Sequence, residues 1–173
     1  MNKKIILFLV ILLWIVLALA MIISKQSTFK TGKAVVLETV PVDPRDLLRG
    51  DYVVLRYKIS TLDLNQIKSE KMDYRAGEAI YVKLEPKGKF WEPTAVQSKR
   101  SSDNGIYIRG KVRHTYSKQL TVIYGIESYF VPEGEGKELE RNTRGSKSSV
   151  SVEAIVDSGG NALIKKVYID KNR

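Results

Sequence analysis

The side chains best suited to chemistry crowd into one short stretch of the sequence. They are Asp43, Arg45, Asp46, Arg49 and Asp51. Pro44 and Gly50 bracket this stretch, so we expect a compact turn in which an Asp side chain accepts hydrogen bonds from backbone N–H groups. The residue types favour a structural motif at the start of a strand. The alternative is a charged corner that binds a partner, because function often lies on turns carried by rigid strands.

Groups for nucleophilic or metal-assisted catalysis are scarce in the sequence. His114 is the single histidine, and no G-x-S-x-G elbow supplies an activated serine. The chain has no cysteine, which excludes disulfides, thiolate zinc sites and a cysteine nucleophile. The glutamates between residues 133 and 140 lack the Asp and Asn spacing of an EF-hand. We therefore expect a non-enzymatic protein with no metal site and no cofactor.

The net charge of +10 is spread along the chain, with acids and bases interleaved. Nucleic-acid binding needs basic residues gathered into a stripe or a recognition motif, so we expect no nucleic-acid partner. A moderate positive balance instead fits contact with anionic lipid headgroups.

The N-terminus carries an uninterrupted apolar segment from Ile5 to Ile23. As a helix it spans roughly 28 Å, which is enough to cross a bilayer. The competing interpretation is a cleaved signal peptide, because Ala18-Leu19-Ala20 has the small-x-small pattern of a cleavage site. The apolar run continues past that site to Ile23, which favours an uncleaved anchor.

The anchor predicts a simple organisation for the chain. Residues 1–4 form a short cytoplasmic end, 5–23 the transmembrane helix, 24–31 a polar tether, and 32–173 one domain on the extracytoplasmic side. The basic residues on the two sides of the helix nearly balance, so the orientation rests on the resemblance of the segment to a signal anchor.

Eight β-branched and apolar runs follow, separated by Gly, Pro, Asn and Asp, and they predict strands. The runs are 34–42, 52–59, 79–84, 90–97, 106–114, 120–131, 150–156 and 162–169. They indicate an antiparallel β sandwich or a barrel-like domain. The residues 157–161 predict a tight hairpin turn, residues 62–74 a short helix or ordered loop, and residues 133–144 a surface loop.

Strand alternation predicts a basic face on the run 106–114. Arg109, Lys111 and Arg113 share this face with Tyr107, while the apolar residues face the core. Such a face is usually solvated, and contact with lipid headgroups or an acidic partner is the alternative.

Two segments carry a family resemblance. The first contains Gly50, Asp51, Tyr52, Leu55 and Tyr57, which spell the pattern that names the GDYxxLxY family, and the Asp-Pro-Arg-Asp stretch before them is similar to the same signature. The second segment is also similar to that family, in the residues Tyr124, Gly125, Ile126, Glu127, Tyr129, Phe130, Pro132, Glu133 and Gly134. Alternation places Leu55 and Tyr57 toward the core and Tyr52 on the opposite face.

The resemblance implies a bacterial membrane-anchored protein and no particular reaction. Members of the family look like frequent companions of polytopic membrane proteins. The resemblance therefore implies that this chain is an accessory or binding subunit for such a membrane protein. Two other hypotheses stay open at this point. One is an extracytoplasmic hydrolase or peptidase with unrecognised Asp, Lys or Ser groups, and the other is an envelope domain that binds a small ligand in an apolar pocket.

Overall fold

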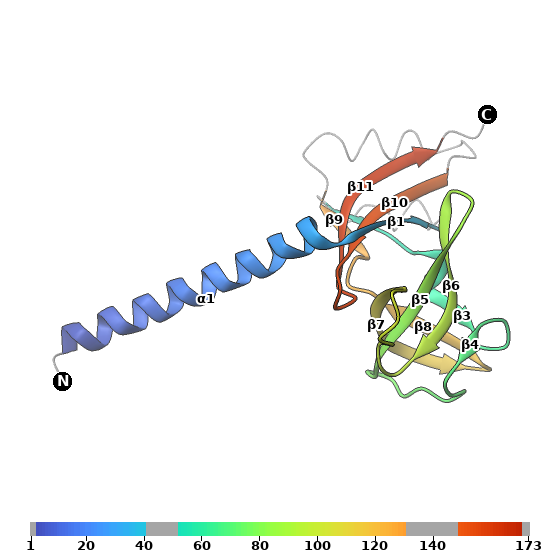
Figure 1. Ribbon diagram of the computed structural model, residues 1–173, viewed down its shortest axis with the longest axis horizontal. Helices are drawn as coiled ribbons and strands as arrows, with labels where there is room; N and C mark the ends of the chain where they lie inside the picture. Colours follow the sequence, from blue (N-terminus) through green and yellow to red (C-terminus); the bar gives the residue numbers. More distant parts are fainter. Residues whose placement is uncertain (1–2, 41–51, 131–148, 171–173) are drawn as a thin grey trace.

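The computed structural model describes residues 3–40, 52–130 and 149–170. Figure 1 shows one long N-terminal helix projecting from a domain that is built almost entirely of strands. This mainly β architecture with an N-terminal apolar helix confirms the predicted fold class. The sheets formed by residues 33–40, 52–130 and 149–170 are open, so the barrel alternative does not hold.

The helix comes first, and in the part of the chain that the structure describes eleven strands and one short 3-10 helix follow it. The elements are α1 (Lys3–Thr31), β1 (Lys33–Glu38), β2 (Tyr52–Val54), η1 (Lys58–Ser60), β3 (Thr61–Asp63), β4 (Lys68–Ser69), β5 (Ala79–Lys87), β6 (Phe90–Gln97), β7 (Ile106–Tyr116), β8 (Gln119–Ile123), β9 (Ser128–Phe130), β10 (Ser149–Val156) and β11 (Ala162–Asp170). The stretch 62–74, for which the sequence predicted a short helix or an ordered loop, contains the end of β3 and the strand β4. The 3-10 turn η1 takes up the end of the predicted strand 52–59, of which only Tyr52–Val54 forms a strand.

Helix α1 begins with a segment, Lys3–Met21, that is long and apolar enough to cross a membrane, and none of it is buried against the domain. The helix does not end where the apolar run ends. It continues through residues 24–31, which the sequence predicted as a polar tether, so this connection is helical. Residues 24–31 include no Gly or Pro, so their sequence contains nothing that breaks a helix.

The junction between α1 and the domain is a single residue, Gly32. The next residue, Lys33, already pairs with Val156 of β10, and the end of the helix contacts β10 and β11. The helix is therefore joined to the sheet almost directly.

The described strands form three sheets. A three-stranded sheet has the order β1-β10-β11, a two-stranded ribbon pairs β2 with β9, and a six-stranded sheet has the order β3-β8-β7-β5-β6-β4. All pairs are antiparallel except β4 with β6, which is parallel, so the large sheet is mixed. The predicted strand 120–131 is two strands, β8 and β9, because a turn at residues 124–127 carries the chain from one sheet to another.

The hydrophobic core lies between the two larger sheets. Val35 and Leu37 of β1 pack in one cluster with Ile80 and Val82 of β5 and Ile108 of β7, and all five side chains are fully buried. Burying each such side chain contributes about 1.5–3 kcal/mol, so this cluster is the main source of stability.

The β10–β11 turn fastens the three-stranded sheet to the large one. Strand β8 pairs with β7 only from Lys111 onward, which leaves the earlier half of β7 without β8 on that edge. The Gly160 carbonyl occupies this edge and accepts a hydrogen bond from the Arg109 N–H at 2.7 Å. Gly160 has a φ of +85°, and a Cβ there would lie 3.0 Å from the Tyr107 carbonyl oxygen and 3.1 Å from the Arg109 nitrogen. The predicted hairpin turn is confirmed, and it also holds the sheets together.

Substitution of this glycine tests the fastening. We expect Gly160→Ala to lower the free energy of unfolding by about 2 kcal/mol, because it combines a strained positive φ with a clash against β7 backbone. The matched control is Gly159→Ala, whose Cβ would meet only side-chain atoms of Asn161 and Asp157. Thermal unfolding of the full chain in detergent measures both. Equal losses in the two variants would contradict a docking role for Gly160.

Candidate functional site

The two segments that carry the family resemblance meet in space. Antiparallel pairing of β2 with β9 places Tyr52 opposite Phe130 and Val54 opposite Ser128. One step further along, the Leu55 N–H donates to the Glu127 carbonyl at 2.7 Å. Segments far apart in the sequence therefore form one structural unit.

Two buried tyrosines lock this unit by reciprocal hydrogen bonds. The Tyr57 hydroxyl donates to the Ile126 carbonyl at 2.5 Å, and the Tyr124 hydroxyl donates to the Ile59 carbonyl at 2.7 Å. Each tyrosine thus satisfies the carbonyl that lies two residues after the other tyrosine. We call Tyr57, Ile59, Tyr124 and Ile126 the tyrosine clasp.

The Glu127 carboxylate holds the turn on which half of the clasp is built. It accepts hydrogen bonds from the Tyr124 N–H at 2.6 Å and from the Gly125 N–H at 2.8 Å, and Gly125 has a φ of +80°. Burial, and secondarily the negative charge of Glu127, raise the pKa of the Tyr57 and Tyr124 hydroxyls above the ordinary value of 10.0. Both hydroxyls therefore stay protonated as donors at neutral pH.

Gly110 makes room for the clasp. A Cβ at this position of β7 would lie 2.3 Å from Cγ1 of Val122 and 3.1 Å from the Tyr124 ring. Sequence reasoning did not single out Gly110. The available signal was a glycine in the interior of a strand pattern, which often marks a close approach of another group.

The remaining predicted motif residues divide into described and undescribed positions. Leu55 and Tyr57 lie in the core, as expected. On β9, Tyr129 is half-buried and the Phe130 side chain is 68% exposed. The other predicted positions, together with the predicted loop 133–144, lie outside the described residues: Asp43, Pro44, Arg45, Asp46, Arg49, Gly50, Asp51, Pro132, Glu133 and Gly134. The partner-binding corner therefore stays a prediction.

The basic face predicted on β7 is present. Arg109, Lys111 and Arg113 are exposed, and within residues 3–40, 52–130 and 149–170 none of them has an ion-pair partner. Ile123 of β8 lies opposite Lys111 and is 42% exposed. We call Arg109, Lys111 and Arg113 the basic stripe.

Tyr107 departs from the prediction that it faces solvent. It belongs to the same strand face as the basic stripe, but its side chain is only 3% exposed. Its hydroxyl donates a hydrogen bond to the Asp103 carboxylate and is also hydrogen-bonded to Ser101, and the Arg100 guanidinium lies 5.8 Å from the centre of its ring. The segment between β6 and β7 therefore covers this residue, which strand alternation alone does not reveal.

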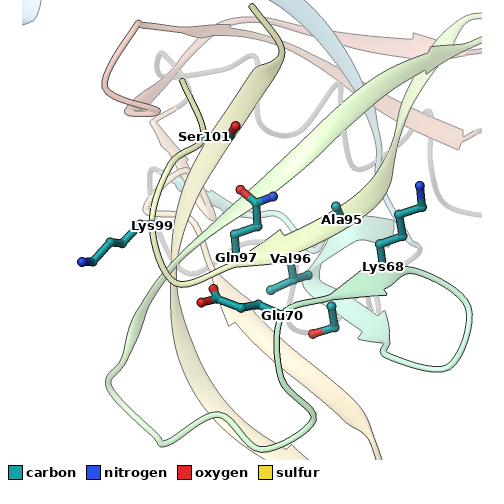
Figure 2. A pocket seen from close by; sticks show the side chains of 8 residues that line it. Lys68, Glu70, Ala95, Val96, Gln97, Lys99 and Ser101 are labelled. Carbon is teal, nitrogen blue, oxygen red and sulfur yellow. The ribbon is translucent and has the colours of Figure 1, made fainter. Parts of the chain in front are cut away.

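A polar hollow lies beside that covering segment, and Tyr107 lines part of it (Figure 2). It consists of two adjoining spaces of about 500 Å³ and 340 Å³, which share Lys68, Ala95, Gln97 and Ser101. The strands β4, β5 and β6 form its floor and walls. No local sequence pattern predicts this hollow, because its lining comes from several strands and a connecting segment.

Ion pairs hold the wall of the hollow. Lys83 Nζ lies 3.1 Å from Asp103 Oδ2 and 3.6 Å from Glu85 Oε1. Hydrogen bonds from Tyr107 and then from Lys83 lower the pKa of Asp103, so its carboxylate is ionised at neutral pH. Nearby, Glu70 Oε2 accepts a hydrogen bond from the Ser98 N–H at 2.7 Å. These acids fix the covering segment.

Comparison with known proteins gives one family match. A family model described as GDYXXLXY protein matches residues 14–167. No curated protein and no solved structure matches the chain.

The clasp predicts a specific loss of stability at alkaline pH. The unfolded chain ionises its tyrosines near pH 10, whereas the folded chain keeps Tyr57 and Tyr124 protonated. The two hydroxyls therefore contribute their full stabilisation below about pH 10. Above that pH the free energy of unfolding falls by up to about 1.4 kcal/mol per pH unit for each tyrosine.

The variant Tyr57→Phe/Tyr124→Phe tests this expectation. At neutral pH we expect each substitution to lower the free energy of unfolding by about 1–3 kcal/mol, because a buried carbonyl loses its donor. Between pH 10 and 11 the double variant should lose stability less steeply than the parent. Tyr116→Phe, at a position 79% exposed, is the control and should retain the parent slope. Identical slopes in the parent and the double variant would contradict the assignment.

Proposed function

The chain belongs to the GDYXXLXY protein family, and we propose that it is a single-pass membrane protein whose β domain docks onto another membrane component. The expected partner is a polytopic membrane protein, and the expected role is that of a non-enzymatic accessory subunit on the extracytoplasmic side. The observation that carries the proposal is an exposed apolar helix joined to the domain through Gly32 alone.

Several features support a retained anchor rather than a cleaved leader. The family match begins at residue 14, inside the apolar segment and before the small-x-small site at Ala18-Leu19-Ala20. The helix also continues without a break from this segment to Thr31, where the end of α1 contacts β10 and β11. A cleavage after Ala20 would fall in the middle of α1 and divide an element that the family model covers.

The length of the helix supports a position for the domain close to the bilayer surface. Residues 22–31 add roughly 15 Å of helix beyond Met21. The headgroup layer takes up about 5–7 Å of this length on each side of the hydrocarbon core. The remaining distance between the headgroups and the domain is comparable to the Debye length of about 8 Å at physiological salt. Basic residues on the side of the domain near the bilayer would therefore be attracted to anionic headgroups.

The basic stripe supplies charges for docking. Arg109 lies beside Gly160, and Gly160 belongs to the turn that follows Val156, the partner of Lys33 at the helix junction. The stripe thus begins near the anchor and extends along β7, with the exposed Ile123 beside it. Unpaired basic side chains around an apolar side chain suit an acidic patch on a membrane protein. They also suit anionic lipid headgroups, whose attraction contributes about 1 kcal/mol of binding free energy for each basic residue.

Single-cysteine labelling tests the anchor and its orientation, since the chain has no native cysteine. Ser158→Cys lies on the exposed β10–β11 turn, and Lys3→Cys lies at the start of α1. In intact cells, a membrane-impermeant maleimide should label Ser158→Cys, whereas Lys3→Cys should react only after permeabilisation. The chain should also stay in the membrane pellet after alkaline carbonate extraction. The reverse labelling pattern would overturn the orientation, and a mature chain beginning at Met21 would overturn the anchor.

Photocrosslinking in intact cells tests the docking role. A photoreactive residue at Lys111 should capture one recurring membrane protein, whereas the same residue at Lys89, on the exposed β5–β6 turn, should not. Adding Arg109→Gln and Arg113→Gln should lower the yield from position 111, because the unpaired charges are removed. Adducts with anionic lipid alone would assign the stripe to headgroups. No specific capture, or equal capture from the two positions, would contradict docking through β7.

A further inference from the structure

The hollow on the six-stranded sheet contains a buried hydroxyl that the fold leaves unsatisfied. In the register of β5 with β6, Ala95 lies opposite Lys83 and Pro93 lies opposite Leu84, so Thr94 between them has no partner and forms a bulge. Thr94 lines the hollow, and its Oγ1 is buried without a hydrogen-bond partner. An unsatisfied buried hydroxyl lowers stability, and bulges are frequent beside binding sites because they redirect side chains.

Two lysines that line the hollow, Lys68 and Lys99, have no ion-pair partner in the described part of the chain. The acids of the wall are engaged, since Lys83 pairs with Asp103 and Glu85 and the Glu70 carboxylate holds the Ser98 N–H. Of the two lysines, Lys68 lines both spaces. The hollow therefore offers a positive charge to a ligand.

Neutral polar groups line the same hollow as Lys68. Figure 2 shows Lys68 and Gln97 extending from neighbouring strands on the same side of β6, with the Ser101 hydroxyl facing the same space and Lys99 directed away from it. The Gln97 amide has no hydrogen-bond partner among the described residues. Amides and hydroxyls both donate and accept, as sugar hydroxyls do.

We propose that this hollow binds a small acidic sugar, with its carboxylate or phosphate on Lys68 and its hydroxyls on Gln97 and Thr94. A rotation of about 120° about χ1 moves Oγ1 to another staggered position, from which it reaches the ligand. The inner space of about 340 Å³ lies at the small end of ligand pockets and suits one sugar unit. The proposal does not depend on the docking role of β7, because the binding groups lie on β4 and β6.

Calorimetric titration of the full chain in phosphatidylcholine nanodiscs tests the ligand class. The probes are glucuronate, glucose 6-phosphate, glucose, acetate and inorganic phosphate. At least one acidic sugar should bind saturably and about tenfold more tightly than glucose and than the matching simple anion. The two acidic probes distinguish a carboxylate ligand from a phosphate ligand. Absence of binding by both, or equal binding by the simple anion, would overturn the proposal.

Four variants test the site itself. Lys68→Gln should weaken binding about tenfold, whereas Lys99→Gln, whose side chain points away, should not change it. Thr94→Val and Ser151→Ala each remove a buried hydroxyl without a partner, so both should raise the midpoint of thermal unfolding by a few degrees. Only Thr94→Val should also weaken sugar binding. Unchanged binding in Lys68→Gln or Thr94→Val would overturn the assignment of these residues.

Discussion

Two backbone carbonyls, those of Ile59 and Ile126, set the constraint on which the rest of the domain depends. Both are buried where the chain leaves regular pairing, and neither has a place in a strand ladder. A buried carbonyl without a donor costs about 1–3 kcal/mol. The two tyrosine hydroxyls meet this need reciprocally, and in doing so they join the β2–β9 ribbon to the end of β8. The family motif is therefore first a solution to hydrogen bonding in the core.

The sequence reveals the parts of this arrangement that depend on side-chain pattern. Alternation placed Leu55 and Tyr57 in the core, apolar runs located β6 with its observed bounds, and Gly159-Gly160 marked a hairpin turn. It could not reveal the acceptors of the tyrosines, because a carbonyl is the same in every residue type. The sequence pattern also does not reveal β4, because a strand of two residues is too short to show alternation. Nor does it reveal that residues 24–31 are helical, because their polar composition resembles that of a flexible linker.

The exposed face of the six-stranded sheet concentrates the groups that the fold does not use. Asp103, in the covering segment between β6 and β7, binds Lys83 of β5 and Tyr107 of β7. On one side of this segment the basic stripe remains unpaired, and on the other side Lys68 and Gln97 remain unpaired among the described residues. Stability explains the groups that hold the segment in place, but it gives no reason for the unpaired groups on either side of it. For that reason the two flanks are the places where function is proposed.

The single-residue connection at Gly32 has a mechanical consequence. A flexible linker would let the domain sample many orientations. A helix joined to a sheet through one residue would instead carry the domain with it when the helix tilts. Transmembrane helices tilt by about 20° on average and adjust this tilt to bilayer thickness. In a membrane, such a change would swing the whole sheet face toward or away from the bilayer surface. Membrane thickness would then act as a control on which surfaces of the domain are within reach of neighbours.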